Sequence, residues 1–282
     1  MIKWGEKMRK KIAEKIIVAL DVPTVKQALN IVEELKKFPV LYKIGHRLLG
    51  YVLGELVASP YEKAEELLRQ LRILFHETYG RLFLDLKFLD IPSVIEEAIR
   101  KYERTGIKII SVSCFGGEES LKKVKEVIDS YDNLFPKPEI FGVAFLSSTE
   151  YADLVRLGRE EFNIANPVEK AYLESKEIEG ILKNIASWLI DDLELDGMVC
   201  PANFVSALRR HVGDNLKLAA VGITTPWSKD AQWDQKQHAS LKKVLEGNPD
   251  YLILGRSIIS PPPEIGSPRD ALERIIEEIE RV

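Results

Sequence analysis

Short apolar runs alternate along the chain with longer segments in which hydrophobic residues recur at helical spacing. Runs rich in β-branched residues and bounded by polar or turn residues are typical of buried strands. The pattern predicts eight strands, over residues 16–20, 40–44, 81–87, 107–112, 139–145, 196–200, 216–221 and 251–255. A segment with the period of a helix follows each of these runs.

Two of the predicted helices carry clear start signals. The helix over 25–37 follows Thr24, whose hydroxyl can accept from the first free backbone N–H groups, and it has a continuous apolar stripe. The helix over 269–282 follows Pro268, a residue suited to the first helical turn. Both helices are therefore expected to pack one face against a core.

Strict alternation of buried strands with helices predicts a parallel sheet covered by helices, an α/β fold. Eight repeats favour closure into a single-domain (β/α)8 barrel, which typically needs about 250 residues. An open dinucleotide-binding sheet usually has a glycine-rich turn after its first strand, whereas this turn reads DVPT. We expect a basic arm or helix over 1–15 and a barrel over 16–282, with insertions near 51–78, 158–180 and 224–239.

Charge and hydropathy restrict the partners. Lys and Arg total 40 against 44 Asp and Glu, a net charge of −4, so we expect no nucleic-acid surface. The apolar runs are far shorter than the roughly 20 residues that cross a bilayer. Residues 1–15 are basic but lack the cleavage site of a secretion signal. We therefore expect a cytoplasmic protein that has no membrane partner.

Cysteine and histidine usage argues against a thiol or metal site. Cys114 and Cys200 lie far apart, without the spacing of a disulfide framework or a zinc ribbon. The four histidines lie in separate segments, without H-x-x-x-H or H-E-x-x-H spacing. The motifs of P-loops and of hydrolase nucleophile elbows are missing as well. We expect chemistry that uses neither thiols nor a metal ion.

Charged residues recur near the C-terminal ends of the first three predicted strands, where (β/α)8 barrels place their functional groups. Asp21 and Lys43 belong to the first two strands, and the third carries Asp85 and Lys87, with Asp90 shortly after it. Residues two apart on a strand face the same side, so Asp85 and Lys87 should point together. That pair alone fits a structural ion pair equally well. The whole set indicates an alternating array in which carboxylates keep each ammonium protonated as a general acid.

A second group of residues follows the last two strands. Gly222 comes after the seventh strand, and Gly255 with Arg256 comes after the eighth. These loops commonly bind phosphate in barrels, because glycine lets backbone N–H groups approach and arginine adds a bidentate cation. An ordinary turn with a surface arginine is the alternative. The charged mouth of the barrel favours phosphate binding.

Taken together, these residues resemble the orotidine 5′-phosphate decarboxylase family. The resemblance rests on VALDVP at 18–23, YKIG at 42–45, LDLKFLDIP at 84–92, DGMVCPA at 196–202, VGI at 221–223 and LGRSI at 254–258. It implies a cofactor-free barrel, usually a homodimer. It also implies conversion of orotidine 5′-phosphate to UMP and carbon dioxide, the last step of pyrimidine synthesis.

The resemblance implies roles for the charged residues. Lys87 resembles the lysine that protonates C6 of the pyrimidine, and Asp85 resembles the carboxylate beside the leaving carbon dioxide. Lys43 resembles the second lysine of this charge network. Asp90 and Ile91 resemble a pair that the other subunit contributes, so each active site would be shared between two chains.

Substrate contacts are implied at further positions. Asp21 resembles a ribose contact, and Ser147 resembles a hydroxyl residue that reads the pyrimidine edge. Gly255 and Arg256 resemble the phosphate grip, beside Gly222. The seventh loop of the family usually adds a glutamine near the phosphate. In this chain the candidates for that contact are Gln235, Gln232 and Lys236. Trp227 and Trp233 in that loop either form a lid or pack on a neighbouring helix.

The chain departs from the family pattern at two positions. Ser113 stands where the family usually has histidine, and Val94 stands where it usually has threonine, which removes a hydroxyl contact to ribose.

Two other functions stay open. A magnesium-dependent sugar-phosphate decarboxylase or aldolase shares the D-x-K-x-x-D motif, but generally has a metal-binding glutamate near the position of Lys43. A catalytically silent nucleotide-binding barrel fits the two departures, but the intact set of Asp85, Lys87 and Asp90 argues against it.

Overall fold

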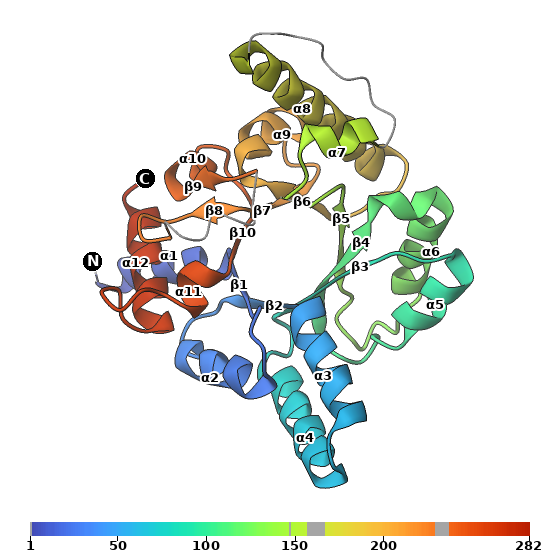
Figure 1. Cartoon of the computed structure of the whole chain (residues 1–282), viewed down its shortest axis with the longest axis vertical. Helices are drawn as coiled ribbons and strands as arrows, with labels where there is room; N and C mark the ends of the chain where they lie inside the picture. The colour runs from blue at the N-terminus through green and yellow to red at the C-terminus, as the bar shows by residue number, and fades with distance from the viewer. Residues whose placement is uncertain (1, 147, 157–166, 229–236) are drawn as a thin grey trace.

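The computed structural model describes residues 2–146, 148–156, 167–228 and 237–282. Within them, parallel strands close into a barrel in the order β1-β10-β7-β6-β5-β4-β3-β2, which Figure 1 shows from one end. The barrel strands are β1 Ile16–Ala19, β2 Leu41–Gly45, β3 Leu82–Phe88, β4 Ile107–Ser113, β5 Glu139–Val143, β6 Gly197–Pro201, β7 Lys217–Val221 and β10 Tyr251–Leu254. The predicted single-domain (β/α)8 barrel is confirmed, and every predicted strand is present with small differences at its ends.

Helices surround the ring of strands on its outer side (Figure 1). They are α1 Ile2–Glu14, α2 Val25–Leu35, α3 His46–Ala58, α4 Tyr61–Glu77, α5 Pro92–Arg100, α6 Gly117–Asp129, α7 Tyr151–Arg156, α8 Pro167–Asp191, α9 Val205–Val212, α10 Leu241–Leu245, α11 Arg256–Ile259 and α12 Pro268–Glu280. Short 3₁₀ turns follow β4 and β6, at Cys114–Gly116 and Ala202–Phe204. No helix in the described ranges is long and apolar enough to cross a membrane.

The predicted helix starts are confirmed. The Thr24 hydroxyl accepts a hydrogen bond from the Gln27 backbone N–H at the start of α2, at 3.2 Å. Pro268 is the first residue of α12, and Ser267 before it forms a reciprocal capping box with Asp270. These caps satisfy N–H groups that the first helical turn leaves unpaired.

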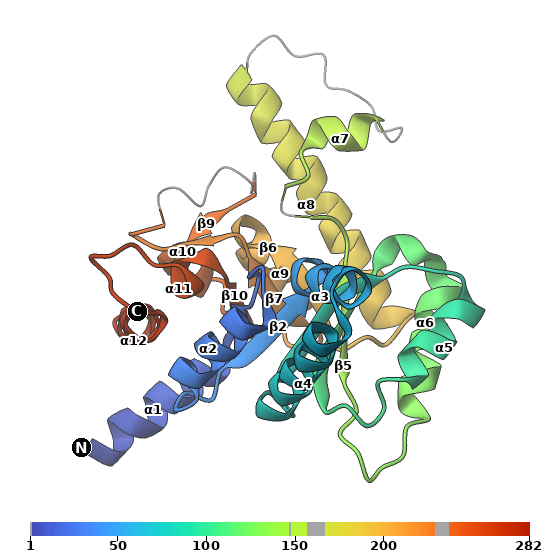
Figure 2. The ribbon, with the colours of Figure 1, turned by 60° about the horizontal axis from the view of Figure 1, so that its bottom comes forward.

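The predicted insertions stay a prediction, and residues 158–166 of the second and 229–236 of the third lie outside the described residues. The segment predicted as the first insertion contains most of α3 and all of α4, which project together from the barrel (Figure 1). Figure 2 shows α8 extending away from the ring of strands. Around the third lies a two-stranded pair, β8 Ile223–Thr224 with β9 Ala239–Ser240. The domain boundaries themselves stay a prediction.

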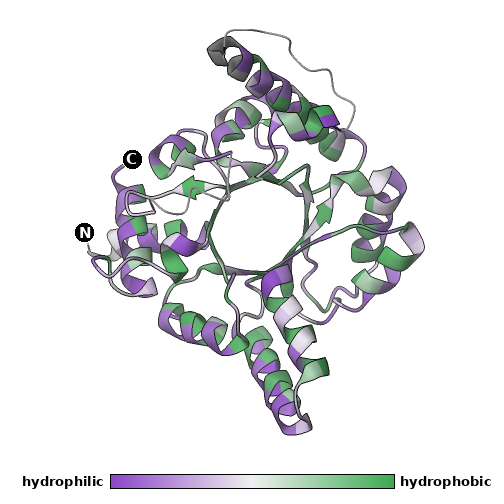
Figure 3. Ribbon diagram, viewed as in Figure 1, coloured by the Kyte–Doolittle hydropathy of each residue, from purple (hydrophilic) through white to green (hydrophobic). Residues whose placement is uncertain are grey.

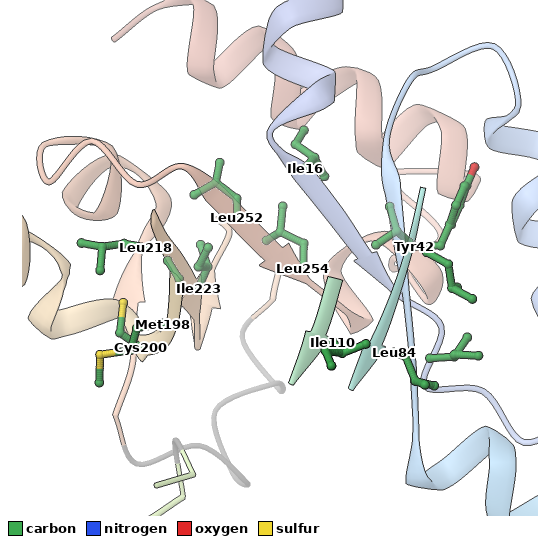
Figure 4. Close-up of a cluster of buried hydrophobic side chains, with 14 of the residues drawn as sticks. Ile16, Tyr42, Leu84, Ile110, Met198, Cys200, Leu218, Ile223, Leu252 and Leu254 are labelled. Carbon is green, nitrogen blue, oxygen red and sulfur yellow. The ribbon is translucent and has the colours of Figure 1, made fainter. Parts of the chain in front are cut away.

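Buried apolar side chains form two clusters because strand residues alternate between the two faces of the barrel wall. The larger cluster fills the space between strands and helices, and Figure 4 shows part of it, including Tyr42, Leu84 and Leu254. Figure 3 shows the corresponding hydrophobic colouring along the ring of strands. The smaller cluster fills the inside of the barrel with Ile17, Ala19, Leu41, Phe83, Ile109, Phe141, Ala219 and Ile253.

Candidate active site

The polar site continues the inward-facing rows of the barrel interior. Lys43, Asp85 and Ser111 each come two residues after an inward-facing core residue, namely Leu41, Phe83 and Ile109. Side chains two apart on a strand share a face, so each polar group follows the core toward the C-terminal end of its strand. Three adjacent strands therefore deliver polar side chains to the same mouth of the barrel.

A cavity of about 430 Å³ opens at this mouth. Its walls include the inward-facing apolar residues Ala19, Val143 and Val199. Its polar lining brings together most of the residues that the sequence singled out, namely Asp21, Lys43, Asp85, Lys87, Gly222, Gly255 and Arg256. Residues that are as far apart in the chain as Asp21 and Arg256 thus share one pocket.

The charged side chains form a connected row. Lys43 Nζ lies 3.4 Å from Asp21 Oδ1 and 3.2 Å from Asp85 Oδ2. Lys87 Nζ donates to the other oxygen of the same carboxylate, Asp85 Oδ1, at 2.9 Å. Asp85 therefore lies between two ammonium groups, which is the alternating arrangement expected from the sequence.

Exposure differs along this row. The side chains of Lys43 and Asp85 are only 11% and 12% exposed, whereas that of Lys87 is 28% exposed. A buried carboxylate is stable only when it is paired and hydrogen-bonded. Both lysines line the cavity, and Lys87 is the more exposed of the two ammonium groups.

Several effects act on the pKa of Asp85. Burial alone raises it, but the charges of Lys43 and Lys87, together with hydrogen bonds from Lys87 and Ser111, hold it below its usual value. The carboxylate consequently stays ionised at neutral pH. The ionised Asp85 carboxylate is thus the counter-charge of both neighbouring lysines.

The predicted phosphate loops lie on the same cavity. Gly222 has φ +83°, a conformation that residues with a Cβ rarely adopt, so glycine is needed at this turn. Gly255 precedes the short helix α11, and Arg256 is its first residue. Trp227 packs against the core and donates from Nε1 to the Ser257 carbonyl at 3.1 Å, so packing is the observed role.

Asp90 and Ile91 do not line the cavity of the single chain. Both lie in the exposed turn between β3 and α5, and Ile91 is 62% exposed. The Asp90 carboxylate accepts from the Ile91 N–H at 2.8 Å, and the Asp90 carbonyl accepts from Ser120 Oγ at 2.8 Å. The turn therefore has a fixed shape while its apolar tip faces outward.

Some predicted contacts fall outside the described residues, namely Ser147, Gln232, Trp233, Gln235 and Lys236. Ser148, next to the first of these, does line the cavity.

Sequence reasoning missed two residues of the mouth. Arg47 lines the cavity from the start of α3, and the buried Ser111 hydroxyl bonds to Asp85. Strand alternation past Ile109 was the available signal for Ser111.

The described residues offer little for metal or thiol chemistry. No group of three His, Cys, Asp or Glu side chains among them is arranged to hold a metal ion. Burial raises the pKa of the Cys114 thiol to about 12, and that of the Cys200 thiol to about 12 as well. Both thiols therefore remain protonated at neutral pH and are poor nucleophiles.

Comparisons with known proteins identify the family of this chain. The model of the orotidine 5′-phosphate decarboxylase / HUMPS family matches residues 14–274. The orotidine 5′-phosphate decarboxylase of Pseudomonas fluorescens strain SBW25 is 30% identical over 264 residues, covering 94% of this chain and 97% of the relative.

Solved structures share the fold at lower identity. An uncharacterized conserved protein from Geobacillus kaustophilus superposes with a TM-score of 0.65 at 22% identity, covering 94% of this chain and 99% of its own. An orotidine 5′-phosphate decarboxylase from Lactobacillus acidophilus gives a TM-score of 0.64 at 22% identity, covering 94% and 98%. From the match to its model over nearly the whole length, the chain belongs to the orotidine 5′-phosphate decarboxylase / HUMPS family.

Proposed function

We propose that the protein decarboxylates orotidine 5′-phosphate to UMP and carbon dioxide, with Lys87 as the proton donor. Family membership and the name of the curated Pseudomonas relative support the reaction. The observation that carries the proposal is the placement of Asp85 between Lys43 and Lys87 at the mouth of the barrel. This places a partly exposed ammonium group next to a buried carboxylate in a cavity large enough for a ligand.

The reaction needs a positive charge held at one carbon of the substrate. When the bond between C6 and the carboxyl group breaks, the electron pair stays on C6 with little resonance stabilisation. A preorganised ammonium stabilises this developing charge better than water, which must reorient. Lys87 then transfers its proton from Nζ to C6 and regains one from solvent. Asp85 holds the Lys87 ammonium in place through the hydrogen bond at 2.9 Å, and Lys43 pairs with the other oxygen of the same carboxylate.

Asp85 has a second effect in this scheme. A substrate carboxylate bound next to Lys87 lies near the ionised Asp85 carboxylate as well, because the two protein groups are 2.9 Å apart. Repulsion between two carboxylates destabilises the bound substrate relative to the transition state, in which carbon dioxide is leaving as a neutral molecule. The same pair of residues thus acts on both sides of the breaking bond.

The rest of the substrate contacts other residues that line the same cavity. Arg256 and the backbone at Gly222 and Gly255 bind the phosphate, and Asp21 binds the ribose. Ser147 and Gln235, outside the described residues, are proposed contacts to the pyrimidine edge and the phosphate. Binding energy from a phosphate remote from C6 holds the reacting carbon against Lys87.

We also propose that the protein is a homodimer with shared active sites. Four exposed apolar residues surround the turn that carries Asp90, namely Leu89 at 59%, Ile91 at 62%, Val94 at 47% and Phe115 at 65% exposure. Leu89 packs beside the turn after β4, since its Cδ1 lies 3.6 Å from where a Cβ on Gly116 would be. An apolar patch of this kind marks a protein interface. A second copy that covers the patch brings Asp90 to its neighbour's cavity.

A magnesium-dependent sugar-phosphate decarboxylase or aldolase is the nearest rival, because the family description covers more than one activity. In this chain Lys43 Nζ occupies the position between Asp21 and Asp85, at 3.4 and 3.2 Å from their oxygens. A divalent cation bound by these two carboxylates would have to displace that ammonium group and face a second one at Lys87. The electrostatics of the site therefore favour the decarboxylase.

The test is an assay of the purified protein with orotidine 5′-phosphate, following the loss of ultraviolet absorbance of the substrate with and without EDTA. Turnover at the same rate in both conditions supports the proposal. Turnover of a sugar phosphate that EDTA abolishes identifies the metal-dependent rival. Tight binding of UMP without turnover of either substrate identifies a silent nucleotide-binding barrel.

A further inference from the structure

The pairing of β3 with β4 is irregular where the catalytic residues lie. Leu84 pairs with Ile110, but the next pair is Phe88 with Val112, so residues 85–87 lie opposite Ser111 alone. Extra residues in one strand leave backbone groups without ladder partners and turn the side chains of the bulged strand. The register shift thus changes the direction in which Lys87 projects.

The backbone of Lys87 has an uncommon conformation. Its φ is +50°, in the left-handed region that residues with a Cβ seldom adopt. Such a conformation persists only when surrounding contacts hold it, and it is frequent at functional sites. The contact that holds Lys87 is therefore important for the position of its ammonium group.

Ser111 supplies that contact. Its side chain is fully buried, and its Oγ accepts a hydrogen bond from the Lys87 backbone N–H at 2.8 Å. The same hydroxyl donates to Asp85 Oδ1 at 2.8 Å, the oxygen that also accepts from Lys87 Nζ. A backbone N–H can only donate and an ionised carboxylate can only accept, so the group between them must do both. A hydroxyl does so, whereas a methyl group does neither.

We infer that Ser111 is a positioning residue, whose hydroxyl fixes the bulge so that the Lys87 ammonium and the Asp85 carboxylate face the reacting carbon. Its catalytic effect rests on the proposed decarboxylase function, whereas its two hydrogen bonds do not. Without the hydroxyl, a buried N–H loses its partner and Asp85 Oδ1 loses a donor. Lys87 then relaxes from its left-handed conformation and its ammonium moves away from C6.

The kinetic test compares Ser111→Ala and Ser111→Thr with the wild type. Because small misplacements of a reacting group are costly, Ser111→Ala should lower kcat for orotidine 5′-phosphate by roughly 100-fold. Its KM should stay within about twofold of the wild type, since the phosphate contacts lie elsewhere. Ser111→Thr retains the hydroxyl on a residue suited to a strand, and should restore most of kcat.

The matched control is Thr78→Val. Thr78 is also fully buried, and its hydroxyl donates to the Leu74 carbonyl at 2.7 Å, at the end of α4 and away from the cavity. This variant loses a buried hydroxyl and some thermal stability, but its kcat should equal that of the wild type. If the Ser111 hydroxyl had only a structural role, Ser111→Ala and Thr78→Val would both lose stability and would have similar kcat values.

A second readout is independent of turnover. Amide hydrogen exchange measured by NMR should be at least about tenfold faster at Lys87 in Ser111→Ala. A carbon-13 titration should show a higher pKa for Asp85, since Lys43 and Lys87 remain but one donor is lost. Ser111→Thr should restore both signals.

The outcomes separate the two proposals. Wild-type kcat in Ser111→Ala, or a threonine variant as impaired as the alanine variant, overturns the positioning role. Unchanged Lys87 exchange and Asp85 titration in Ser111→Ala overturn it as well, even if no substrate is turned over. A wild-type protein that fails to decarboxylate orotidine 5′-phosphate overturns the proposed function instead.

Discussion

At the scale of single residues, replacing Arg256 should change a different kinetic parameter from replacing Lys87: KM for Arg256 and the rate of product formation for Lys87. Arg256 lines the same cavity as Lys43, Asp85 and Lys87, but from the first residue of α11, after β10. Arg256→Ala should raise KM by roughly 10- to 100-fold, the cost of losing a charged hydrogen bond, with little change in kcat. The variant should also discriminate less between the phosphorylated substrate and its nucleoside. Steady-state kinetics on both compounds measures this.

An Arg256→Lys variant is the matched control, because it retains the charge but loses the bidentate geometry. It should fall between the wild type and the alanine variant in KM. If phosphate preference is unchanged in Arg256→Ala, the phosphate is held by the seventh loop, and Gln235 is the next residue to replace.

Asp85 should give the protein an acid-sensitive component of stability. Its pKa is lowered in the folded state, so folding stabilises the ionised carboxylate relative to the unfolded chain. That stability is present above the pKa of the unfolded carboxyl, about 4, and is lost as the pH falls through the lower native pKa. Asp85→Asn should be less stable than the wild type at pH 7 by about 3 kcal/mol, because two lysines lose their counter-charge.

Urea unfolding of both proteins at pH 7, 5 and 3 measures this difference. The gap in unfolding free energy should be similar at pH 7 and 5 and should shrink at pH 3. A gap that is constant across this range would mean that the Asp85 charge does not contribute to folding stability.

Most of the charged site was predictable from the sequence because strand alternation is a local rule. Asp85 follows Phe83 by two residues, and the core residue fixes the face of the polar one. Ser111 was not predicted, because its role depends on a register shift between two strands, which is a tertiary feature. Its bonds to Lys87 and Asp85 join positions that no local motif connects.

At the scale of elements, the two ends of the barrel differ in chemistry. At the N-terminal end, Glu139 begins β5 and pairs with Lys108 of β4 at 2.6 Å and Lys217 of β7 at 2.9 Å. Barrels use this end for stability and the opposite end for function. Glu139→Gln should therefore lower the unfolding free energy by about 1 kcal/mol, since both lysines are partly exposed, and leave kcat within about twofold.

Thermal unfolding followed by circular dichroism, together with the decarboxylation assay, checks the Glu139 prediction. Lys125→Gln, in an exposed pair with Asp129 on α6, is the matched control and should change stability less. A large loss of kcat in Glu139→Gln would show that the closed end of the barrel affects the site.

The strands were predictable because they are largely buried on both faces and read as short, mainly apolar runs. The elements outside the ring of strands were harder to predict from the sequence. The α3–α4 projection was expected only as an insertion, because long amphipathic segments do not show in which direction they leave the barrel. The strands β8 and β9 have two residues each, and a strand of two residues is too short to show any periodicity in the sequence.

At the scale of the whole molecule, the proposed homodimer predicts complementation between two inactive variants. In a mixed dimer of Lys87→Ala and Asp90→Ala chains, one site has both residues intact and the other has neither. Random exchange of subunits should therefore restore about a quarter of the wild-type activity. Activity is measured after exchange that mass spectrometry of differently labelled chains has verified.

The control mixes each variant with itself, which should restore nothing. No recovery after verified exchange would contradict the shared site.

The dimer was implied by family resemblance and not by local sequence pattern, because an exposed residue such as Ile91 carries no periodic signal. Its outward position becomes visible only once the turn between β3 and α5 is placed.

We propose that this barrel removes carbon dioxide from orotidine 5′-phosphate and that Lys87 delivers the proton to C6. The most direct measurement is NMR of the reaction in D₂O with the wild type and Lys87→Ala. The wild type should produce UMP with deuterium at C6 and release an equal amount of carbon dioxide. Lys87→Ala should bind UMP but form product at least about 100-fold more slowly. Unchanged substrate with the wild type would contradict the proposed reaction. UMP formed at a comparable rate by Lys87→Ala would contradict the proposed role of Lys87 as proton donor.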